Sequence, residues 1–378
     1  MKELVRDFIQ DIEQPFHGDI VKRKAKKYGI DKDEILDLST NVNPIGPPNS
    51  VINSIKKNIG NISKYPPHQP ENLRNILADY SGSSRDNIVL GNGSNELFYL
   101  LCRVFLNPND EVVIAEPTFS EYSKAIKTQG GKLRSVQLRE EKDFNLEVER
   151  MKDKINSDTK LVFLCSPNNP TGQMVSLDDL RDILERCKSC KSILVFDEAF
   201  YEFCDNPEIF NVAEMELGNL VSVRTLTKFY GLPGLRIGYM ILPPKISKIF
   251  RQIQVQWNVN ILAQIAAKEA VRDDKFVKET KRAIKESKNY LLRKLKNFDE
   301  LEVYPSDANF FLLKLSSTAY TSHELVEELI KEKIAIRSCD DFRFLDENFV
   351  RVNIAKKKDC KRFIESLEEI FSTSNYNG

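Results

Sequence analysis

Histidine is scarce in this sequence, which has three among 378 residues: His17, His68 and His323. A zinc site built on imidazole, or a histidine-based proton relay, needs such side chains close together. Metal hydrolases and triad hydrolases are therefore disfavoured.

Net charge is absent too, because 56 Lys and Arg balance 56 Asp and Glu. No overall basic field can gather nucleic acid or an anionic membrane, so any anion must be bound locally.

Long apolar runs are also missing. No stretch approaches the roughly 18 apolar residues of a membrane span, and MKELVRDFIQDIEQPF at the start lacks the continuous apolar core of a signal peptide. The seven cysteines are an odd number, in a chain long enough not to need disulfides. Cys187 and Cys190 have metal or redox spacing, but no second pair completes a site, which favours helix-end cysteines. We expect a cytoplasmic protein with no membrane or nucleic-acid partner.

Short apolar runs alternate with helix-period stretches between about residues 85 and 245. The runs are IVL from 88, EVVIAEP from 111, KLVFLCSP from 160, SILVFDEA from 192, LVSVRTLT from 220 and GYMILP from 238. Alternation of this kind predicts an α/β fold with a mainly parallel sheet covered by helices on both faces.

A second pattern follows a long charged helical stretch at roughly 262–297. It holds LEVYP, NFFLLKL, a helix over 321–332, AIRSC, FVRVNIA and a last helix to about 371, which predicts a smaller α+β domain. We expect an N-terminal arm with part of the small domain at 1–45, a large domain at 46–270 and a small domain at 271–378. The Pro-rich NVNPIGPPNS, from Asn41, is interpreted as a linker.

Ligands in open α/β sheets bind beyond the carboxyl ends of the strands, and the residues there are polar. GNGSNE, from Gly91 to Glu96, opens a helix whose free backbone N–H groups suit a phosphate, although such a turn is common. The turn from Cys165 to Gly172 contains two prolines. Asp197 follows a run that should be buried, where a helix N-cap is the alternative interpretation. These strand ends are the candidate ligand site.

Lys228 closes another apolar strand, and its surroundings distinguish it from an ordinary surface lysine. Thr225 and Thr227 flank it, and a Gly231 to Gly234 turn and Arg236 follow. Hydroxyls, a glycine turn and an arginine suit a phosphate dianion, while a desolvated lysine beside them suits imine formation. Pyridoxal phosphate requires a lysine amine, a carboxylate for its pyridinium nitrogen, a donor to its phenolic oxygen, an aromatic face and a phosphate cup.

All of these groups are present in order, and the sequence resembles the fold-type I pyridoxal-phosphate enzymes, aminotransferase class I/II, over essentially its whole length. The resemblance implies a mainly parallel, mixed sheet of the seven-stranded type. It assigns Lys228 to the cofactor aldehyde, Asp197 to the pyridinium nitrogen and Asn169 to the phenolic oxygen and substrate. Other cofactor contacts would come from Phe119, which stacks on the ring, and from Ser94, Asn95, Thr225, Thr227 and Arg236, which hold the phosphate.

The same resemblance implies a homodimer in which Tyr65 reaches the partner's cofactor phosphate. Arg351, in FVRVNI, matches the family's substrate-carboxylate arginine, and Arg337 would give a second cationic fork for a phosphorylated amino acid. His17 and Gly18 would cover the substrate, with Asn41 nearby. A catalytically inactive binding protein of this fold is disfavoured, because Lys228 and its partners are intact.

Two branches of the family fit, histidinol-phosphate aminotransferases and threonine-phosphate decarboxylases of cobalamin biosynthesis. FHGDI, LDLSTNVNPIGPP, TLTKFYGLPGLRIGY, QWNVN and IRSCDDF resemble the decarboxylases more closely, although one glycine after Gly18 is missing. Phe200 stands where the aminotransferases usually carry Tyr. The expected reaction is decarboxylation of L-threonine O-3-phosphate to 1-aminopropan-2-ol O-phosphate. The alternatives are amino-group transfer from histidinol phosphate to 2-oxoglutarate and decarboxylation of L-serine O-phosphate.

Overall fold

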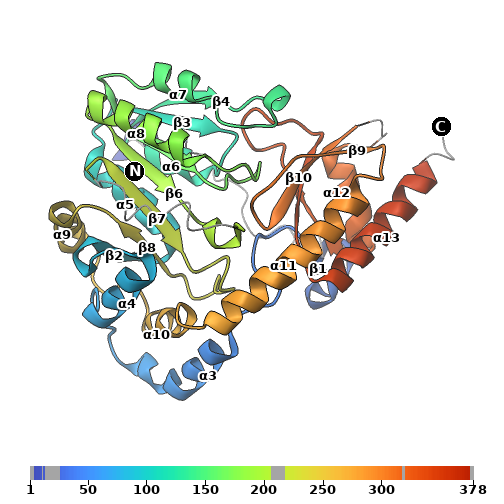
Figure 1. Ribbon diagram of the computed structural model, residues 1–378, viewed down its shortest axis with the longest axis horizontal. Coiled ribbons are helices and arrows are strands. Elements are labelled where there is room, and N and C mark those ends of the chain that lie inside the picture. Colours follow the sequence, from blue (N-terminus) through green and yellow to red (C-terminus); the bar gives the residue numbers. More distant parts are fainter. Residues whose placement is uncertain (1–3, 11, 13–25, 206–217, 317–319, 375–378) are drawn as a thin grey trace.

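The structure is a computed structural model that describes residues 4–10, 12, 26–205, 218–316 and 320–374 (Figure 1). Its main feature is a seven-stranded sheet, here called the large sheet, with the order β2-β8-β7-β6-β5-β3-β4. Only β8 runs antiparallel to its neighbours. The strands are β2 Ile88–Gly91, β3 Glu111–Glu116, β4 Lys132–Gln137, β5 Thr159–Cys165, β6 Ile193–Asp197, β7 Leu220–Thr225 and β8 Gly238–Ile241. The predicted mainly parallel α/β sheet is confirmed.

Most strands of the large sheet are mainly apolar because both faces are covered. Every residue of β2, β7 and β8 is buried. Helices α4 to α10 and α3 accompany this sheet, with bounds α3 Asn49–Asn58, α4 Glu71–Ser81, α5 Gly93–Phe105, α6 Glu121–Lys127, α7 Val148–Lys154, α8 Leu177–Cys190, α9 Pro244–Ile253 and α10 Ile261–Ala270. Cys187 and Cys190 lie at the end of α8, as expected. In the described part of the chain no cluster of His, Cys, Asp and Glu is arranged to hold a metal.

A second, smaller sheet has the order β12-β13-β10-β9 and is antiparallel throughout. Its strands are β9 Leu301–Val303, β10 Phe310–Leu315, β12 Arg337–Ser338 and β13 Phe349–Asn353, and a separate parallel pair is formed by β1 Leu36–Asp37 and β11 Ile334–Ala335. The pair joins an N-terminal segment to the C-terminal part of the chain. The boundaries at residues 45 and 270 stay a prediction.

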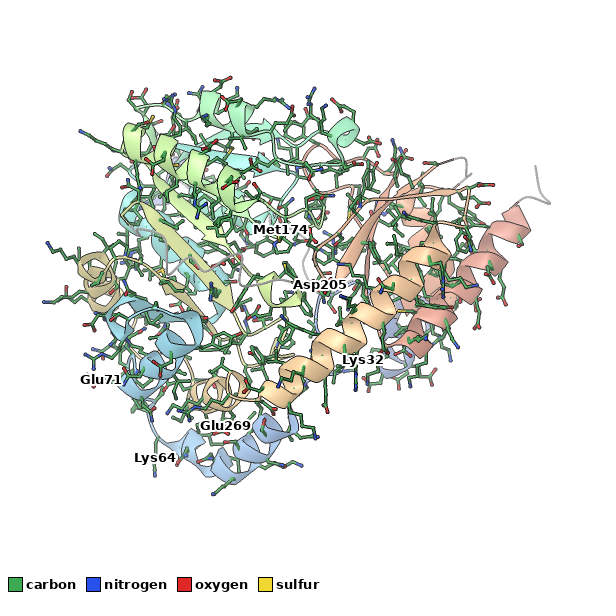
Figure 2. All side chains as sticks on the ribbon, viewed as in Figure 1. Lys32, Lys64, Glu71, Met174, Asp205 and Glu269 are labelled. Atoms are coloured by element: carbon green, nitrogen blue, oxygen red, sulfur yellow. The ribbon has the colours of Figure 1, made fainter. Side chains whose placement is uncertain are left out.

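Helix α11, Asp274–Leu295, runs from the side of α10 toward the small sheet, where α12 Ser322–Lys331 and α13 Lys357–Ser374 lie (Figure 1). The expected continuous helix over 262–297 is instead divided, since α10 ends at Ala270 and the Asp273 side chain caps α11 by accepting from the Phe276 N–H. Asp205 lies beside α11 (Figure 2) and pairs with Lys285 at 3.2 Å. None of the described helices combines the length and the hydropathy that a bilayer crossing requires.

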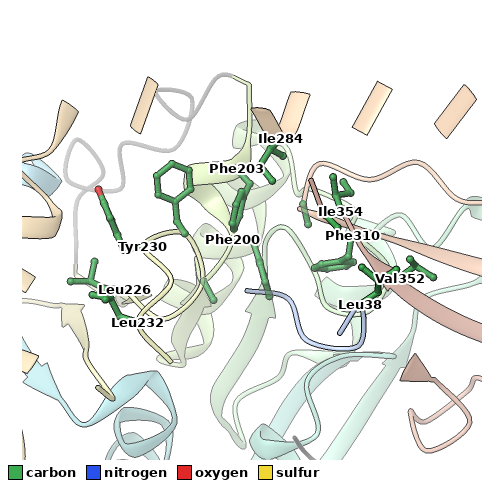
Figure 3. Packing of buried hydrophobic residues seen from close by; sticks show 14 of the residues in the cluster. Leu38, Phe200, Phe203, Leu226, Tyr230, Leu232, Ile284, Phe310, Val352 and Ile354 are labelled. Carbon is green, nitrogen blue, oxygen red and sulfur yellow. The ribbon is translucent and has the colours of Figure 1, made fainter. Parts of the chain in front are cut away.

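One hydrophobic cluster connects the two sheets. It contains Phe200 and Phe203 after β6, Phe310 and Val352 of the small sheet, and Ile284 of α11 (Figure 3). Phe200 packs edge-on against Phe310 with their ring centroids 5.2 Å apart. This shared core holds the small sheet against the carboxyl ends of the parallel strands, which is where the candidate site lies.

Candidate functional site

A cavity of about 570 Å³ lies at the carboxyl ends of β5, β6 and β7. That volume is within the usual range for small-molecule and cofactor sites. The predicted residues that line it are Asn41, Ser94, Asn95, Phe119, Asn169, Asp197, Thr225, Thr227, Lys228, Arg236, Arg337 and Arg351. The structure therefore brings together residues that are up to 310 positions apart in the sequence, from Asn41 to Arg351.

One end of the cavity is built to receive an anion. Helix α5 begins at Gly93, so Ser94 and Asn95 present the N–H groups of its first turn. Gly93 has φ +78°, and a Cβ there would lie 2.6 Å from Arg236 Nη2. Any other residue at this position would therefore clash with the Arg236 guanidinium. A buried Asn95 oxygen has no hydrogen-bond partner within the described residues. Together they form a cradle for a phosphate.

Thr225 and Thr227 line the same part of the cavity from the end of β7. Thr225 Oγ1 donates to Thr227 Oγ1 at 2.8 Å and also accepts from the Thr227 N–H at 3.2 Å. The backbone therefore turns back immediately after the strand and leaves both hydroxyls at the cavity. Two hydroxyls beside a guanidinium and a helix N-terminus complete a set of donors for one phosphate.

Lys228 follows these threonines, and no described residue accepts a hydrogen bond from its amine. The pKa of this amine is lowered to about 8, mainly by burial and then by Arg351 and Arg236, while Asp197 acts in the opposite direction. The Nζ lies 5.9 Å from the centre of the Phe200 ring. About a tenth of such amines are neutral at pH 7, and the neutral amine is the form that attacks an aldehyde.

Asp197 ends β6 with its side chain toward the cavity and is 4% exposed. Its carboxylate accepts from the Tyr122 hydroxyl and from the Ala199 N–H at 3.0 Å. Burial raises the pKa of Asp197 to about 6, while Tyr122, Ala199 and Lys228 act in the opposite direction. Glu198, the next residue, is fully buried and pairs with Arg224, Nε to Oε2 3.0 Å. Asp197 is thus the acid that faces a ligand.

Asn169 and Arg351 meet at the wall of the same cavity, Asn169 from the loop after β5 and Arg351 from β13. The Arg351 guanidinium donates to the Asn169 side-chain oxygen and, at 2.8 Å, to the Ser39 carbonyl. Its Nε has no partner in the described part of the chain. Burial lowers the pKa of Arg351 to about 10, and the nearby Arg337 also lowers it. An unneutralised buried guanidinium is suited to binding a carboxylate or phosphate.

The segment from Asn41 to Ser50 is more than the linker that its prolines suggest. Asn43 is buried, its N–H donates to the Lys228 carbonyl at 3.0 Å, and its Nδ2 donates to the Phe229 carbonyl at 2.7 Å. Asn41 is 2% exposed, with a side-chain oxygen that lacks a partner among described residues. The linker interpretation stays a prediction, and the Asn43 amides in addition satisfy backbone carbonyls of the Lys228 loop.

Tyr122 and Glu121 are among the cavity residues that the sequence analysis missed. Tyr122 binds Asp197, and Glu121 accepts from Tyr99 at 3.0 Å and from Asn95 at 3.2 Å. Both lie in EPTFSEY, directly after Phe119, but helical spacing within one turn does not show which side chains face a cavity. Phe119 itself lines the cavity and packs edge-on against Tyr122, with centroids 5.6 Å apart.

One predicted site residue that the structure describes, Tyr65, does not line the cavity. Tyr65 is 78% exposed and stacks on Trp257, with ring centroids 4.3 Å apart, so it is outside the cavity of its own chain. Its assignment to a partner's cofactor phosphate stays a prediction. His17 and Gly18 lie outside the described residues, and so their predicted cover of the substrate is untested.

The fold and the cavity are those of a pyridoxal-phosphate enzyme, and comparisons with known proteins define the class. The model of the family "Aminotransferase class I and II" matches residues 33–367. The chain belongs to this family, and its cofactor is pyridoxal 5′-phosphate. The orphaned polar atoms and the glycine-dependent anion cradle fit that cofactor.

Most of the similar proteins are histidinol-phosphate aminotransferases. A histidinol-phosphate aminotransferase from Methanothermobacter thermautotrophicus is 34% identical over 370 residues, 97% of each chain. The structure of histidinol-phosphate aminotransferase from Clostridium acetobutylicum has a TM-score of 0.83 at 30% identity, covering 90% of this chain and all of that one. An L-threonine-O-3-phosphate decarboxylase from Porphyromonas gingivalis has a TM-score of 0.79 at 27% identity, covering 89% and 100%. These relatives support the aminotransferase alternative better than the expected decarboxylase.

Proposed function

We propose that this enzyme transfers the amino group of a phosphorylated amine, of the histidinol phosphate class, to 2-oxoglutarate. The observation that carries the proposal is the end-to-end similarity to histidinol-phosphate aminotransferases, at 34% identity over 97% of both chains. The cavity agrees with it, because both substrates of this reaction bring an anion to a pocket that already holds Arg351 and Arg337.

Nine of the predicted cavity residues would hold the cofactor. We assign Lys228 to its aldehyde, Asp197 to its pyridinium nitrogen, Asn169 to its phenolic oxygen and Phe119 to its ring. We assign the phosphate to Ser94, Asn95, Thr225, Thr227 and Arg236. When bound, the cofactor supplies a ring that withdraws electrons from the substrate Cα.

Proton movement would depend on Lys228 and Asp197. Since the pKa of the buried amine is lowered to about 8, Lys228 Nζ can both accept and return a proton near neutral pH. Asp197 keeps its negative charge through the hydrogen bonds from Tyr122 and the Ala199 N–H. A carboxylate at this point would stabilise a positively charged ring nitrogen.

A second candidate function is decarboxylation of L-threonine O-3-phosphate, and Phe200 favours it. Its ring lines the cavity where a tyrosine hydroxyl would give a further donor, and it is held by Phe310 and faces Lys228. The sequence motifs around Asn41, Gln256–Asn260 and Ile336–Phe342 also resemble the decarboxylases. A substrate with a carboxylate and a phosphate would again occupy Arg351 and Arg337. L-Serine O-phosphate is the smaller variant of this candidate.

We further propose that the active form is a homodimer. Large apolar side chains are exposed together near η3, Ile59–Ser63, and in the loop after α9, with exposed fractions of 50% for Ile59, 66% for Ile62, 78% for Tyr65, 69% for Val255 and 45% for Trp257. Such a patch is covered most simply by a second copy of the chain. Tyr65 would then contact the partner's cofactor phosphate.

The test is a direct comparison of substrates. The purified enzyme, loaded with pyridoxal phosphate, is given L-histidinol phosphate with 2-oxoglutarate, and glutamate is measured. In parallel it is given L-threonine O-3-phosphate or L-serine O-phosphate, and released CO₂ is measured. We expect glutamate in the first reaction. CO₂ release without 2-oxoglutarate, together with no glutamate, would establish the second candidate instead.

Phe200→Tyr tests whether Phe200 favours decarboxylation. If the missing hydroxyl directs the reaction, this variant should raise the ratio of amino transfer to CO₂ release with L-threonine O-3-phosphate. Phe203→Tyr, in the same core but not at the cavity wall, is the matched control. An unchanged ratio in both would remove the structural argument for the decarboxylase.

A further inference from the structure

The two cavity arginines are not equivalent. Arg337 and Arg351 lie directly opposite each other on the antiparallel strands β12 and β13. Opposed residues on one face of a sheet have Cβ atoms about 4.5–5.5 Å apart, and like charges there repel. Each guanidinium is nearly buried, with exposures of 8% for Arg337 and 7% for Arg351. A counter-charge is therefore needed close by.

Among the residues that the structure describes, Arg337 has such a partner and Arg351 does not. Arg337 Nη2 donates to both oxygens of Asp341, at 2.7 and 2.5 Å, and Nη1 donates to the Ser338 carbonyl at 2.7 Å. Arg351 is bonded only to neutral oxygens, those of Asn169 and Ser39, and within the described residues it makes no ion pair. Arg351 is thus open to a ligand anion, while Arg337 already holds a carboxylate.

We propose that Asp341 is a specificity-determining residue, a built-in counter-anion that a ligand must displace in order to use Arg337. The inference rests on the proposed role of the two arginines in substrate binding. Exchanging the Asp341 carboxylate for a ligand carboxylate replaces one charge-assisted pair by a similar one and gains little. A phosphate dianion brings more charge and more acceptor oxygens, so it competes better. The second subsite therefore prefers a phosphate to a carboxylate.

Asp341→Asn removes the charge of the competitor while keeping its size. Binding to the pyridoxal-phosphate-loaded enzyme is measured by titration calorimetry with glutarate, which has two carboxylates, and with pentanoate, which has the same number of carbons and one carboxylate. We expect glutarate to bind at least about tenfold more tightly to D341N, since it gains a charge-assisted pair. Pentanoate can use only Arg351 and should change less than about twofold.

The neighbouring residue provides a matched control. Asp340 binds His323 Nε2 at 2.8 Å and the Ser338 hydroxyl at 2.5 Å, and no hydrogen bond or ion pair joins it to Arg337 in the described structure. Asp340→Asn should leave the affinity for both probes unchanged. Asp341→Glu keeps the charge and should restore wild-type affinity for glutarate. Added to Arg337→Ala, Asp341→Asn should have no further effect.

Three results would overturn the proposal: unchanged glutarate affinity in D341N, an equal gain for pentanoate, or the same gain in the Arg337→Ala background. Because the titration measures anion binding without turnover, it is separate from the proposed function. An enzyme that forms no glutamate from histidinol phosphate would refute that function and leave the role of Asp341 standing. An active enzyme with unchanged glutarate affinity in D341N would refute only the proposed role of Asp341.

Discussion

The lowered pKa of Lys228 predicts how cofactor loading depends on pH. With the pKa at about 8 instead of the ordinary 10.5, about a tenth of the amines are neutral at pH 7, roughly 300-fold more than for an ordinary lysine. The attachment rate should rise about tenfold per pH unit below pH 8 and level off above it. Burial is the main cause, and Arg351 is the next. Arg351→Gln should therefore move the bend in the pH profile to a higher pH.

The assay mixes cofactor-free protein with pyridoxal phosphate and follows the visible absorbance of the lysine-bound cofactor. Borohydride fixation and mass spectrometry then locate the adduct on Lys228. Arg251→Gln changes a partly buried arginine outside the cavity and should leave the bend in place. A wild-type rate that keeps rising tenfold per unit to pH 10 would show that Lys228 titrates as an exposed lysine, and the account of its burial would be wrong.

Three further predictions follow from the same geometry. Lys228→Met should stabilise the cofactor-free protein by on the order of 2–3 kcal/mol below pH 8, because the pKa of Lys228 is lower in the folded state than in the unfolded state. This gain, measured by urea unfolding, should disappear as the pH rises from 8 to 10.5. Arg343 lies outside the cavity and bonds to Ser135 at 2.6 Å and to Glu116 at 3.3 Å, so Arg343→Ala should cost under about 1 kcal/mol of stability in urea unfolding and leave KM unchanged; a raised KM would show that this contact acts on the cavity. Tyr65→Ala should weaken cofactor binding in the dimer, whereas a fully active monomer in sedimentation would refute the shared site.

The parallel sheet and its ligand-binding edge were predictable because they depend on local patterns. Fully buried strands are continuous apolar runs, and Asp197 and Lys228 stand out as polar residues at their ends. Strand β4, KLRSVQ, was not among the predicted runs, since it lies at the edge of the sheet and carries charged residues. Edge strands need no continuous apolar sequence.

The parts that could not be predicted depend on contacts between distant segments. Arg351 bonds to Asn169, which is 182 positions away in the sequence. Asn43 bonds to Phe229, in the Lys228 loop, which is 186 positions away. No periodicity within one segment encodes such a pairing. The ion pair between Arg337 and Asp341 is local in the sequence. Its role in ligand binding depends on Arg351, which faces Arg337 only in the folded sheet, and so the sequence does not predict it.

The charges around the cavity link stability to ligand binding. Lys228, Arg236 and Arg351 surround one space, and their mutual repulsion contributes to the lowered pKa of Lys228. Asp197 offsets part of that repulsion but is itself buried, which raises its pKa to about 6. Each anion that binds, the cofactor phosphate first and a substrate anion second, reduces the repulsion that the empty cavity carries. Phosphate binding at Arg236 should therefore raise the proton affinity of Lys228, so that the two residues are coupled through charge although no hydrogen bond between described residues joins them.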